Sequence, residues 1–385
     1  MTEAQDRLRV LVVTRNLPPL RGGMERLNLH MLGELAKAFD VAVVGIAGCG
    51  AFVPVPIAVH EVPAKPLWRF FLAAFFRSIG VARRFRPAVV LAGSGLTAPF
   101  AWFAARSAGA RLAVYVHGLD LVTAHPVYRR VWLPFIRRAD VCIANSSNTA
   151  RLAIAAGVAA ERVSIVHPGV ETPSAPGAVN DFRERFALGD RPLMLSVGRL
   201  VARKGLFEFV ENALPRIVSS FPRVCLLILG EANPELLSGS SAGLAERIRA
   251  RAQALGLAEN VKFLGTQPDA VLADAYRAAD VHVFPGRDVS GDVEGFGMVA
   301  VEAAAHGLLT VAFAVGGVPD AVDDGVSGTL VRAGDYGACA DAINTILRHG
   351  RDETRRNAAR QFAERFRWEV FGTRVRELLA ALRAT

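Results

Sequence analysis

The sequence contains two glutamates eight positions apart around a glycine-rich turn, in "GDVEGFGMVAVEAAAHG" from residue 291 to residue 307. Glu294 comes directly before the turn, and Glu302 lies within small residues that favour a helix. Gly295 and Gly297 let backbone N–H groups point at an anion where the helix dipole favours negative charge. A carboxylate repels phosphate but accepts hydrogen bonds from sugar hydroxyl groups. The stretch therefore predicts a site for a nucleotide-linked sugar, and the alternative for this spacing alone is an exposed helix with a capping glutamate.

A second stretch, "SVGRLVARKG", places two cations near the end of a predicted strand. Arg199 ends the strand, and Lys204 follows five residues later, just before the next helix. Gly198 and Gly205 hold the turn between them. An arginine fork and a mobile lysine charge together suit a diphosphate group. Taken alone, the pair is more often a solvated surface pair, so the assignment depends on the other motifs.

Two loops in the first half have similar features. In "LPPLRGGMERLNLHML", the glycines Gly22 and Gly23 allow the backbone to approach a ligand before a helix opens near Met24. In "YVHGLD", His117 stands at the end of a predicted strand. The alternatives are a tight strand-to-helix turn for the glycines and a packed or solvated imidazole for the histidine.

These side chains follow short runs of β-branched and leucine residues that alternate with helical patterns, which is typical of parallel sheets made of βαβ units. Strands are predicted at residues 8–14, 40–47, 88–94, 112–118, 140–146 and 163–169, and then at 192–199, 224–231, 261–265, 281–286 and 309–314. Ligands of open parallel sheets bind beside the carboxyl ends of the strands. The motifs above lie at those ends.

A chain of 385 residues with 52% hydrophobic content is long enough for two domains of ordinary size. Residues 169–179, "GVETPSAPGAV", are rich in proline, glycine and small polar residues and show no periodicity, so they are predicted to be a linker. The sequence therefore predicts an α/β protein with one domain over residues 1–170 and another over residues 180–365.

Several classes of protein are disfavoured by composition. The four cysteines form no C-x-x-C pair, which argues against a zinc site and a disulfide framework and predicts a reduced compartment. The first residues lack the basic segment of a signal peptide, and no apolar stretch approaches the length of a spanning helix. A cytoplasmic protein, either soluble or peripheral on the inner face of the membrane, is expected.

Positive charge is concentrated in the first half. Residues 1–170 carry 20 lysines and arginines against 9 acidic residues, whereas the formal net charge of the whole chain is +9. Residues 65–86 combine aromatic residues with arginines, which predicts contact with an anionic membrane. The alternative is a partly buried helix whose arginines reach solvent at its edges. No recognition motif for nucleic acid accompanies this charge.

A competing motif lies at Gly93-x-Gly95-x-x-Ala98, with Asp120 after a later strand. This pattern resembles the fingerprint of dinucleotide-binding folds and gives an alternative function, a dinucleotide-dependent oxidoreductase. The motif follows an internal strand rather than the first one, which weighs against it.

Taken in order, the loops resemble those of the family-4 retaining glycosyltransferases of GT-B architecture. The resemblance spans nearly the whole chain. It is carried by Gly22-Gly23, His117-Gly118, "VGRL…KG" at 197–205, "LGE" at 229–231, "EGFG…EAAAHG" at 294–307 and "GGVPD" at 316–320.

The resemblance implies two Rossmann-like domains facing across a cleft, with a C-terminal helix at about 368–385 packing back on the first. It implies transfer of a hexose, with retention, from GDP-mannose or a UDP-hexose to a glycan or lipid-linked acceptor in cell-envelope or surface polysaccharide biosynthesis. No metal or other cofactor is implied. The implied catalytic residues are His117, Arg199, Lys204 and Glu294. The implied nucleotide-sugar-binding residues are Gly22, Gly23, Gly198, Arg199, Lys204, Glu231, Glu294, Gly295, Phe296, Gly297, Met298 and Glu302.

The sequence departs from the family pattern at three places. Asp320 stands where many relatives have glutamate, and His167 begins a segment that is more often Pro-Asn-Gly. The loop at residues 286–292 is longer than in many relatives and adds Arg287 and Asp292 beside the expected donor site. The loop leaves the identity of the sugar open.

Overall fold

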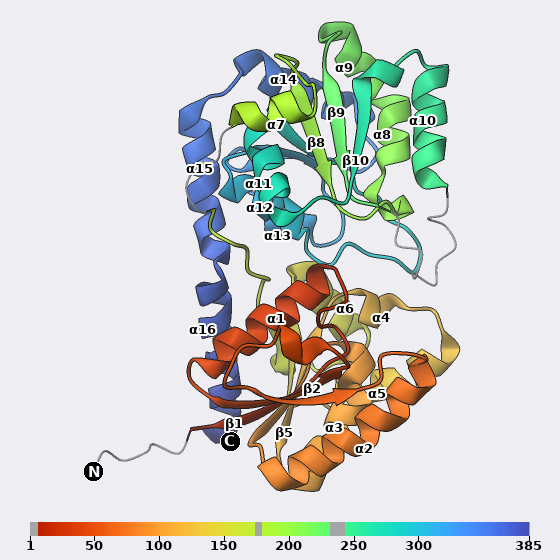
Figure 1. The fold of residues 1–385 in the computed structure, drawn as a ribbon. Coiled ribbons are helices and arrows are strands. Elements are labelled where there is room, and N and C mark those ends of the chain that lie inside the picture. Colours follow the sequence, from red (N-terminus) through yellow and green to blue (C-terminus); the bar gives the residue numbers. More distant parts are fainter. Residues whose placement is uncertain (1–6, 174–178, 232–242, 385) are drawn as a thin grey trace, which may run out of the picture. The chain divides into compact units, whose positions relative to one another are not determined.

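The computed structural model describes residues 7–173, 179–231 and 243–384, and it divides into two compact units (Figure 1). The chain passes between the units at Gly169–Val170 and again at Arg367–Trp368, so the C-terminal segment belongs to the first unit. Of the predicted linker, residues 174–178 lie outside the described residues.

The first unit contains a parallel sheet with the strand order β3-β2-β1-β4-β5-β6-β7. Its strands are β1 (Arg9–Val13), β2 (Asp40–Ile46), β3 (Ala58–Val62), β4 (Val89–Ala92), β5 (Arg111–Val116), β6 (Val141–Ala144) and β7 (Val163–Ile165). Strand order reverses between β1 and β4, and ligands of such sheets bind at this point.

Helices cover both faces of this sheet. The long ones are α1 (Gly23–Ala36), α2 (Leu67–Phe85), α3 (Ala98–Ala108) and α16 (Trp368–Ala384). The short ones are η1 (Cys49–Ala51), η2 (Gly95–Thr97), α4 (Leu119–Val122), η3 (Tyr128–Trp132), α5 (Leu133–Arg137), α6 (Ser147–Ala155) and η4 (Ala160–Arg162). α2 packs on α3, and α16 packs on α1. Arg376 of α16 donates to Glu34 of α1 at 2.8 Å, and the Trp368 ring stacks on His30 at 4.1 Å.

The second unit contains a parallel sheet with the order β10-β9-β8-β11-β12-β13. Its strands are β8 (Leu193–Val197), β9 (Cys225–Leu229), β10 (Val261–Gly265), β11 (Val281–Phe284), β12 (Thr310–Phe313) and β13 (Gly328–Val331). Its helices are α7 (Val179–Arg185), η5 (Ala202–Lys204), α8 (Leu206–Asn212), α9 (Leu214–Ser220), α10 (Leu244–Ala254), η6 (Ala258–Asn260), α11 (Asp269–Ala278), α12 (Met298–Ala305), α13 (Val318–Ala321), α14 (Tyr336–His349), α15 (Glu353–Ala363) and η7 (Glu364–Phe366). Strand order reverses between β8 and β11.

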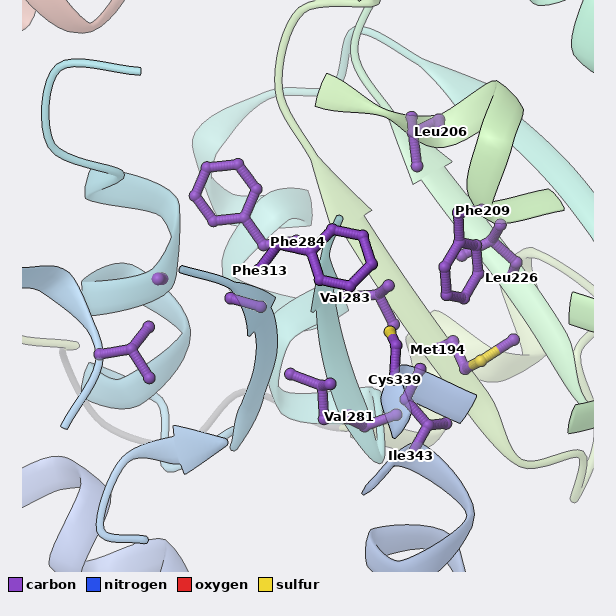
Figure 2. Packing of buried hydrophobic residues seen from close by; sticks show 14 of the residues in the cluster. Met194, Leu206, Phe209, Leu226, Val281, Val283, Phe284, Phe313, Cys339 and Ile343 are labelled. Carbon is purple, nitrogen blue, oxygen red and sulfur yellow. The ribbon is translucent and has the colours of Figure 1, made fainter. Parts of the chain in front are cut away.

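The core of the second unit follows the two-residue period of its strands. Met194 and Leu226 point into one apolar cluster, together with Phe209 of α8 and Ile343 of α14 (Figure 2). Their neighbours in the sequence, such as Leu195, point into a second cluster on the opposite face. Strands buried on both faces appear in a sequence as unbroken apolar runs, so these strands could be predicted.

Each predicted run contains a strand of the structure, which confirms those predictions. Two further strands, β3 and β13, were missed. Both are at sheet edges, where partly exposed residues break the apolar run. β3 carries His60 and Glu61 in its five residues, so its sequence gives little sign of a strand.

Candidate active site

The loops that follow β8 and β11 bring the predicted cationic and acidic motifs together in the second unit. These strands pair at the point where strand order reverses, which is where ligands of such sheets bind. Lys204 ends the short helix η5 after β8, and Glu294 follows β11. The Lys204 Nζ atom lies 2.9 Å from Oε2 of Glu294. Two motifs that are 90 positions apart in the sequence therefore form one charged centre.

Lys204 is held in place by groups on several sides. Its Nζ lies 4.2 Å from the centre of the Phe284 ring, a cation–π contact at the end of β11. Its side chain passes over Gly198, where a Cβ would lie 3.4 Å from Cε of Lys204. The next residue, Gly205, has φ of +66° and approaches the Pro285 carbonyl so closely that a Cβ would collide with it. The two glycines predicted to shape this turn are thus required for packing.

Arg203 is the main residue of this centre that the sequence did not indicate. It is buried, its Nη1 donates to Oε2 of Glu294, and its Nε donates to Asp292 at 3.1 Å. Burial alone would raise the pKa of Glu294, but the charges of Lys204 and Arg203 outweigh it and hold that pKa below its ordinary value. Glu294 is therefore ionised at neutral pH between two cations.

Arg199 is exposed beside this centre. Burial lowers the pKa of Lys204, with Glu294 opposing that shift and the nearby charges of Arg203 and Arg199 adding to it. A bound diphosphate would place negative charge beside these cations and favour the charged lysine. The centre therefore places the positive charges of Lys204, Arg203 and Arg199 around the carboxylate of Glu294, and this arrangement suits the binding of a further anion.

The turn that leads into α12 is built by close backbone contacts. Gly297 is the N-cap of α12, with φ of +100°. The Phe296 side chain is buried and packs on Phe366, so only its backbone can serve a ligand. A Cβ at Gly316 or Gly317 would overlap the carbonyl oxygens of residues 294 and 295. The "GGVPD" glycines therefore hold the acidic turn in place.

Glu302 lies within α12, which begins at Met298 and follows Gly295 and Gly297. Its side chain is buried, and its Oε2 accepts a hydrogen bond of 3.0 Å from the Tyr276 hydroxyl group. Tyr276 comes from α11 and was not singled out in the sequence. A carboxylate fixed in this way is oriented to accept further hydrogen bonds from hydroxyl groups.

Glu231 stands after β9, next to the loop of Arg199. Its carbonyl accepts from the N–H of Leu200, and its carboxylate accepts from the N–H of Thr266 at 3.2 Å. Gly230 approaches the carbonyl of Gly198 so closely that a side chain would collide with it. The "LGE" motif thus joins the ends of β8 and β9 beside the cationic loop.

In the first unit, His117 follows β5 and is buried. Its Nε2 lies 3.0 Å from the Gly93 carbonyl and therefore carries the proton, which leaves Nδ1 as the acceptor nitrogen of the neutral ring. Its backbone N–H donates to Asp120 at 3.1 Å. The histidine is fixed in one orientation, as a residue that positions a substrate would be.

Gly22 and Gly23 stand at the start of α1, as predicted. The Glu25 carboxylate faces Gly22, where a Cβ would collide with Oε2, and its Oε1 accepts from Asn16 at 2.8 Å. No motif of the sequence indicates Glu25 as part of this turn. In the structure it places a negative charge at the helix N-terminus that the sequence predicts to lie beside a ligand.

The competing dinucleotide motif is filled by side chains of the protein itself. A Cβ at Gly93 would collide with Asn28 and Thr14, and one at Gly95 would lie 2.7 Å from Asp120 and the Tyr128 hydroxyl group. The space over these two glycines is thus occupied by side chains, which weighs against the oxidoreductase alternative.

The long loop at residues 286–292 contacts the charged centre through its own ion pairs. Asp292 bonds Arg203, and Arg287 pairs with Glu208 of α8. Both residues were expected beside the donor site. Asp292 reaches the charged centre through Arg203, which bonds both Asp292 and Glu294. Within the described ranges, no group of histidine, cysteine and acidic residues could hold a metal ion, and no helix is long and apolar enough to cross a membrane.

Two parallel sheets with candidate ligand-binding loops after their strands fit the GT-B architecture of nucleotide-sugar-dependent glycosyltransferases, and comparison with known proteins agrees. Residues 179–365 match the family model "Glycosyl transferases group 1", and residues 21–173 match "Glycosyltransferase Family 4". The chain belongs to this family of glycosyltransferases.

Among its relatives is the GDP-mannose-dependent α-(1-6)-phosphatidylinositol monomannoside mannosyltransferase of Mycolicibacterium smegmatis, which is 32% identical and aligns over 97% of this chain and 99% of its own. The D-inositol 3-phosphate glycosyltransferase of Mycobacterium tuberculosis is 35% identical over 61% of this chain but only 47% of its own length.

Solved structures share the fold. Anabaena HepE in complex with UDP has a TM-score of 0.79 at 22% identity, with 97% of this chain and all of HepE covered. The sucrose-phosphate synthase of Thermosynechococcus elongatus has a TM-score of 0.76 at 22% identity, with 98% of this chain and all of the synthase covered.

Proposed function

We propose that this glycosyltransferase moves a mannosyl group from GDP-mannose to a lipid-linked acceptor, with retention of the anomeric configuration, in the synthesis of cell-envelope or surface glycans. The observation that carries the proposal is the charged centre of Lys204 and Glu294 at the carboxyl ends of β8 and β11. Glu302 lies in α12, the helix that follows Glu294 in the chain. The donor and the kind of acceptor are suggested by the name of the M. smegmatis relative, which aligns over nearly all of this chain. A UDP-hexose is the second candidate donor.

Each charged residue has one task in this proposal. Arg199 and Lys204 hold the diphosphate, Glu302 accepts from the ribose, and Glu294 accepts from a hydroxyl group of the transferred sugar. As the bond between sugar and diphosphate breaks, negative charge grows on the leaving oxygen, and the cations stabilise it. That oxygen takes the proton of the acceptor hydroxyl while the new bond forms on the same face, which retains the configuration.

The remaining predicted residues support binding in the same proposal. His117 accepts from a sugar hydroxyl through Nδ1, and the backbone of Gly22 and Gly23 approaches the diphosphate. Glu231 and the backbone from Gly198 and from residues 295–298 complete the donor site. The reaction proceeds without a metal ion or another cofactor, because the cations and the N-terminus of α12 supply the positive charge.

Thermal stability in the presence of nucleotides tests the donor assignment, because a ligand that binds only the folded state raises its melting temperature. We expect GDP and GDP-mannose to raise the melting temperature of the wild-type protein and to have no effect on Arg199→Ala. UDP, ADP and NAD should give smaller shifts. A larger shift with UDP would replace mannose by a UDP-hexose, and a shift with NAD alone would contradict glycosyl transfer.

We also propose that α2 places the protein on the surface of an anionic membrane. Phe70 is buried in the first unit, whereas Trp68, Leu72 and Phe76 are 59%, 55% and 69% exposed. These three residues are four positions apart and therefore form one stripe along the helix. Arginines at positions 69, 77, 83 and 84 share the helix with this stripe. An exposed apolar stripe with neighbouring cations is suited to a bilayer of anionic lipids.

Vesicle sedimentation tests this membrane contact with two phenylalanines of similar exposure. Phe76→Ser should weaken binding to vesicles containing phosphatidylglycerol by about tenfold, as expected for losing one inserted aromatic side chain. Phe52→Ser, at a residue that is 50% exposed and lies outside α2, is the matched control and should bind as the wild type does. Equal binding by both variants, or no preference for anionic over phosphatidylcholine vesicles, would contradict the proposal.

A further inference from the structure

The second unit contains a cavity of about 450 Å³ at the ends of α11 and α12. Five arginines line it, at positions 277, 351, 356, 360 and 367. Glu171 and Glu364 are the two carboxylates of its lining. Its walls also include residues 170–173, which follow the first crossing between the units, and Arg367, which precedes the second. Nothing in the donor site accounts for this group of cations.

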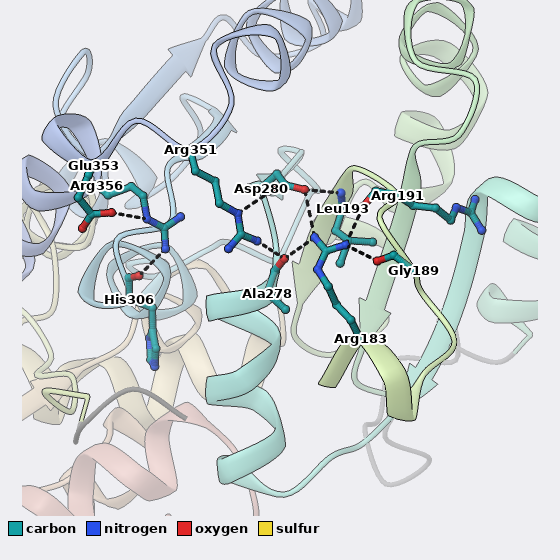
Figure 3. Close-up of polar contacts among 10 residues, drawn as sticks. All are labelled: Arg183, Gly189, Arg191, Leu193, Ala278, Asp280, His306, Arg351, Glu353 and Arg356. Atoms are coloured by element: carbon teal, nitrogen blue, oxygen red, sulfur yellow. Dashed lines mark hydrogen bonds and ion pairs between the residues drawn. The ribbon is translucent and has the colours of Figure 1, made fainter. Parts of the chain in front are cut away.

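Part of this arginine cluster serves the carbonyl ends of the helices (Figure 3). Arg351 donates through Nη2 to the Ala278 carbonyl at 2.6 Å and through Nε to Asp280 at 3.1 Å. Arg356 lies 3.5 Å from the His306 carbonyl and pairs with Glu353 at 3.6 Å. Cations at the ends of helices offset the partial negative charge of the dipole there. These contacts explain the position of the two guanidinium groups but use only some of their five N–H donors each.

The other three arginines also meet carboxylates. Arg277 lies 2.6 Å from Asp274, Arg360 lies 2.5 Å from Glu353, and Arg367 lies 2.9 Å from Glu364. Donor capacity remains in the lining, because the Nε of Arg277 is buried without a hydrogen-bond partner. A buried donor without a partner is destabilising, so a ligand that accepts from this atom would restore its hydrogen bond.

We propose that this cavity is a second ligand site, which binds a small phosphorylated molecule. A phosphate group accepts several charge-assisted hydrogen bonds, and arginines match its geometry by donating two at a time. The volume lies in the range of small-molecule sites, so it accommodates a phosphate with an organic group attached. The site is separate from the donor centre, because it lies at the C-terminal end of α12, about 12 Å along the helix from the turn at Gly297.

Two contacts connect this cavity to the rest of the enzyme. The His306 ring lines the cavity and stacks on Tyr276 at 5.2 Å, and the Tyr276 hydroxyl group donates to Glu302 of the donor site. Val170 donates through its N–H to the Phe366 carbonyl at 2.7 Å, which joins the two chain segments that lead to the first unit. A ligand in the cavity therefore contacts residues adjoining both the donor carboxylate and the chain crossings.

Isothermal titration with inorganic phosphate, at constant ionic strength, tests the site. Arg356→Gln and Arg360→Gln should each weaken saturable phosphate binding by about tenfold, as expected for losing one charge-assisted contact. Arg355→Gln is the matched control, because it removes the same charge from the same helix outside the cavity lining. Lys204→Ala should leave phosphate binding unchanged, which separates this site from the donor centre. GDP titration of the three arginine variants confirms that the second unit is folded, and circular dichroism confirms it for Lys204→Ala.

Three results would overturn the proposal. They are the absence of saturable phosphate binding by the wild type, equal binding by Arg355→Gln and both cavity variants, and loss of binding only in Lys204→Ala. Arg356 is the more buried of the two cavity arginines, with 12% of its side chain exposed against 37% for Arg360. If Arg356→Gln fails to bind GDP, the comparison of Arg360→Gln with Arg355→Gln decides the outcome.

Discussion

Lys204→Met is expected to lower kcat/KM for the nucleotide-sugar donor by about a thousandfold, the upper range for removal of one group that stabilises transition-state charge. Methionine keeps the apolar stem that packs over Gly198 and against Phe284. It removes the cation that faces Glu294 at 2.9 Å. The loss should appear in steady-state kinetics mainly as a lower kcat, because charge on the diphosphate grows as the bond to the sugar breaks.

Lys262→Met is the matched control for this prediction. Lys262 is in the same unit, on β10, and donates to a backbone carbonyl rather than to a group of the charged centre. Its variant should retain donor kinetics within about threefold of the wild type, since no transition-state contact is lost. Similar kinetics for Lys204→Met and the wild-type protein would show that the lysine does not contact the leaving diphosphate.

Glu294→Gln is expected to lower kcat/KM for transfer by about a hundredfold while leaving the affinity for free nucleoside diphosphate unchanged or higher. The carboxylate accepts from both Arg203 and Lys204, and the amide removes its negative charge from the centre. Phosphate is then attracted more strongly by the remaining cations, whereas a charged acceptor for the sugar hydroxyl is lost. Enzyme kinetics and titration with GDP measure the two effects separately.

Asp292→Asn provides the control for Glu294→Gln. Asp292 shares Arg203 with Glu294, but 41% of its side chain is exposed, so its charge is more strongly screened by solvent. Its variant should keep transfer within about threefold. If transfer by Asp292→Asn is as impaired as transfer by Glu294→Gln, the glutamate acts through Arg203 alone. If the GDP affinity of Glu294→Gln falls as far as its transfer activity does, the glutamate does not bind the transferred sugar.

The parts of the fold that could be predicted are those in which local pattern and burial agree. Central strands such as β8 and β9 are buried on both faces, so their apolar runs stand out in the sequence. The edge strands β3 and β13 have partly exposed residues and were missed. The order of strands within each sheet depends on long-range pairing, which no local pattern encodes.

The site shows the same limit at the level of single residues. Lys204 and Glu294 could be found because they follow strands and neighbour glycines. Arg203 could not, because the direction of each side chain in a single turn of η5 depends on packing against β11 and its loop. Glu25 was missed for a related reason, since only the fold shows that its carboxylate faces Gly22. Contacts between loops distant in sequence are therefore what the structure adds.

A crystal structure of the protein with GDP bound tests the central claim most directly. The account predicts that the diphosphate lies within hydrogen-bonding distance of Arg199 and Lys204 and that the ribose hydroxyl groups donate to Glu302. Glu294 should face the place of the transferred sugar, beyond the terminal phosphate. A diphosphate bound away from Lys204, with the ribose remote from Glu302, would contradict the assignment of this centre as the donor site.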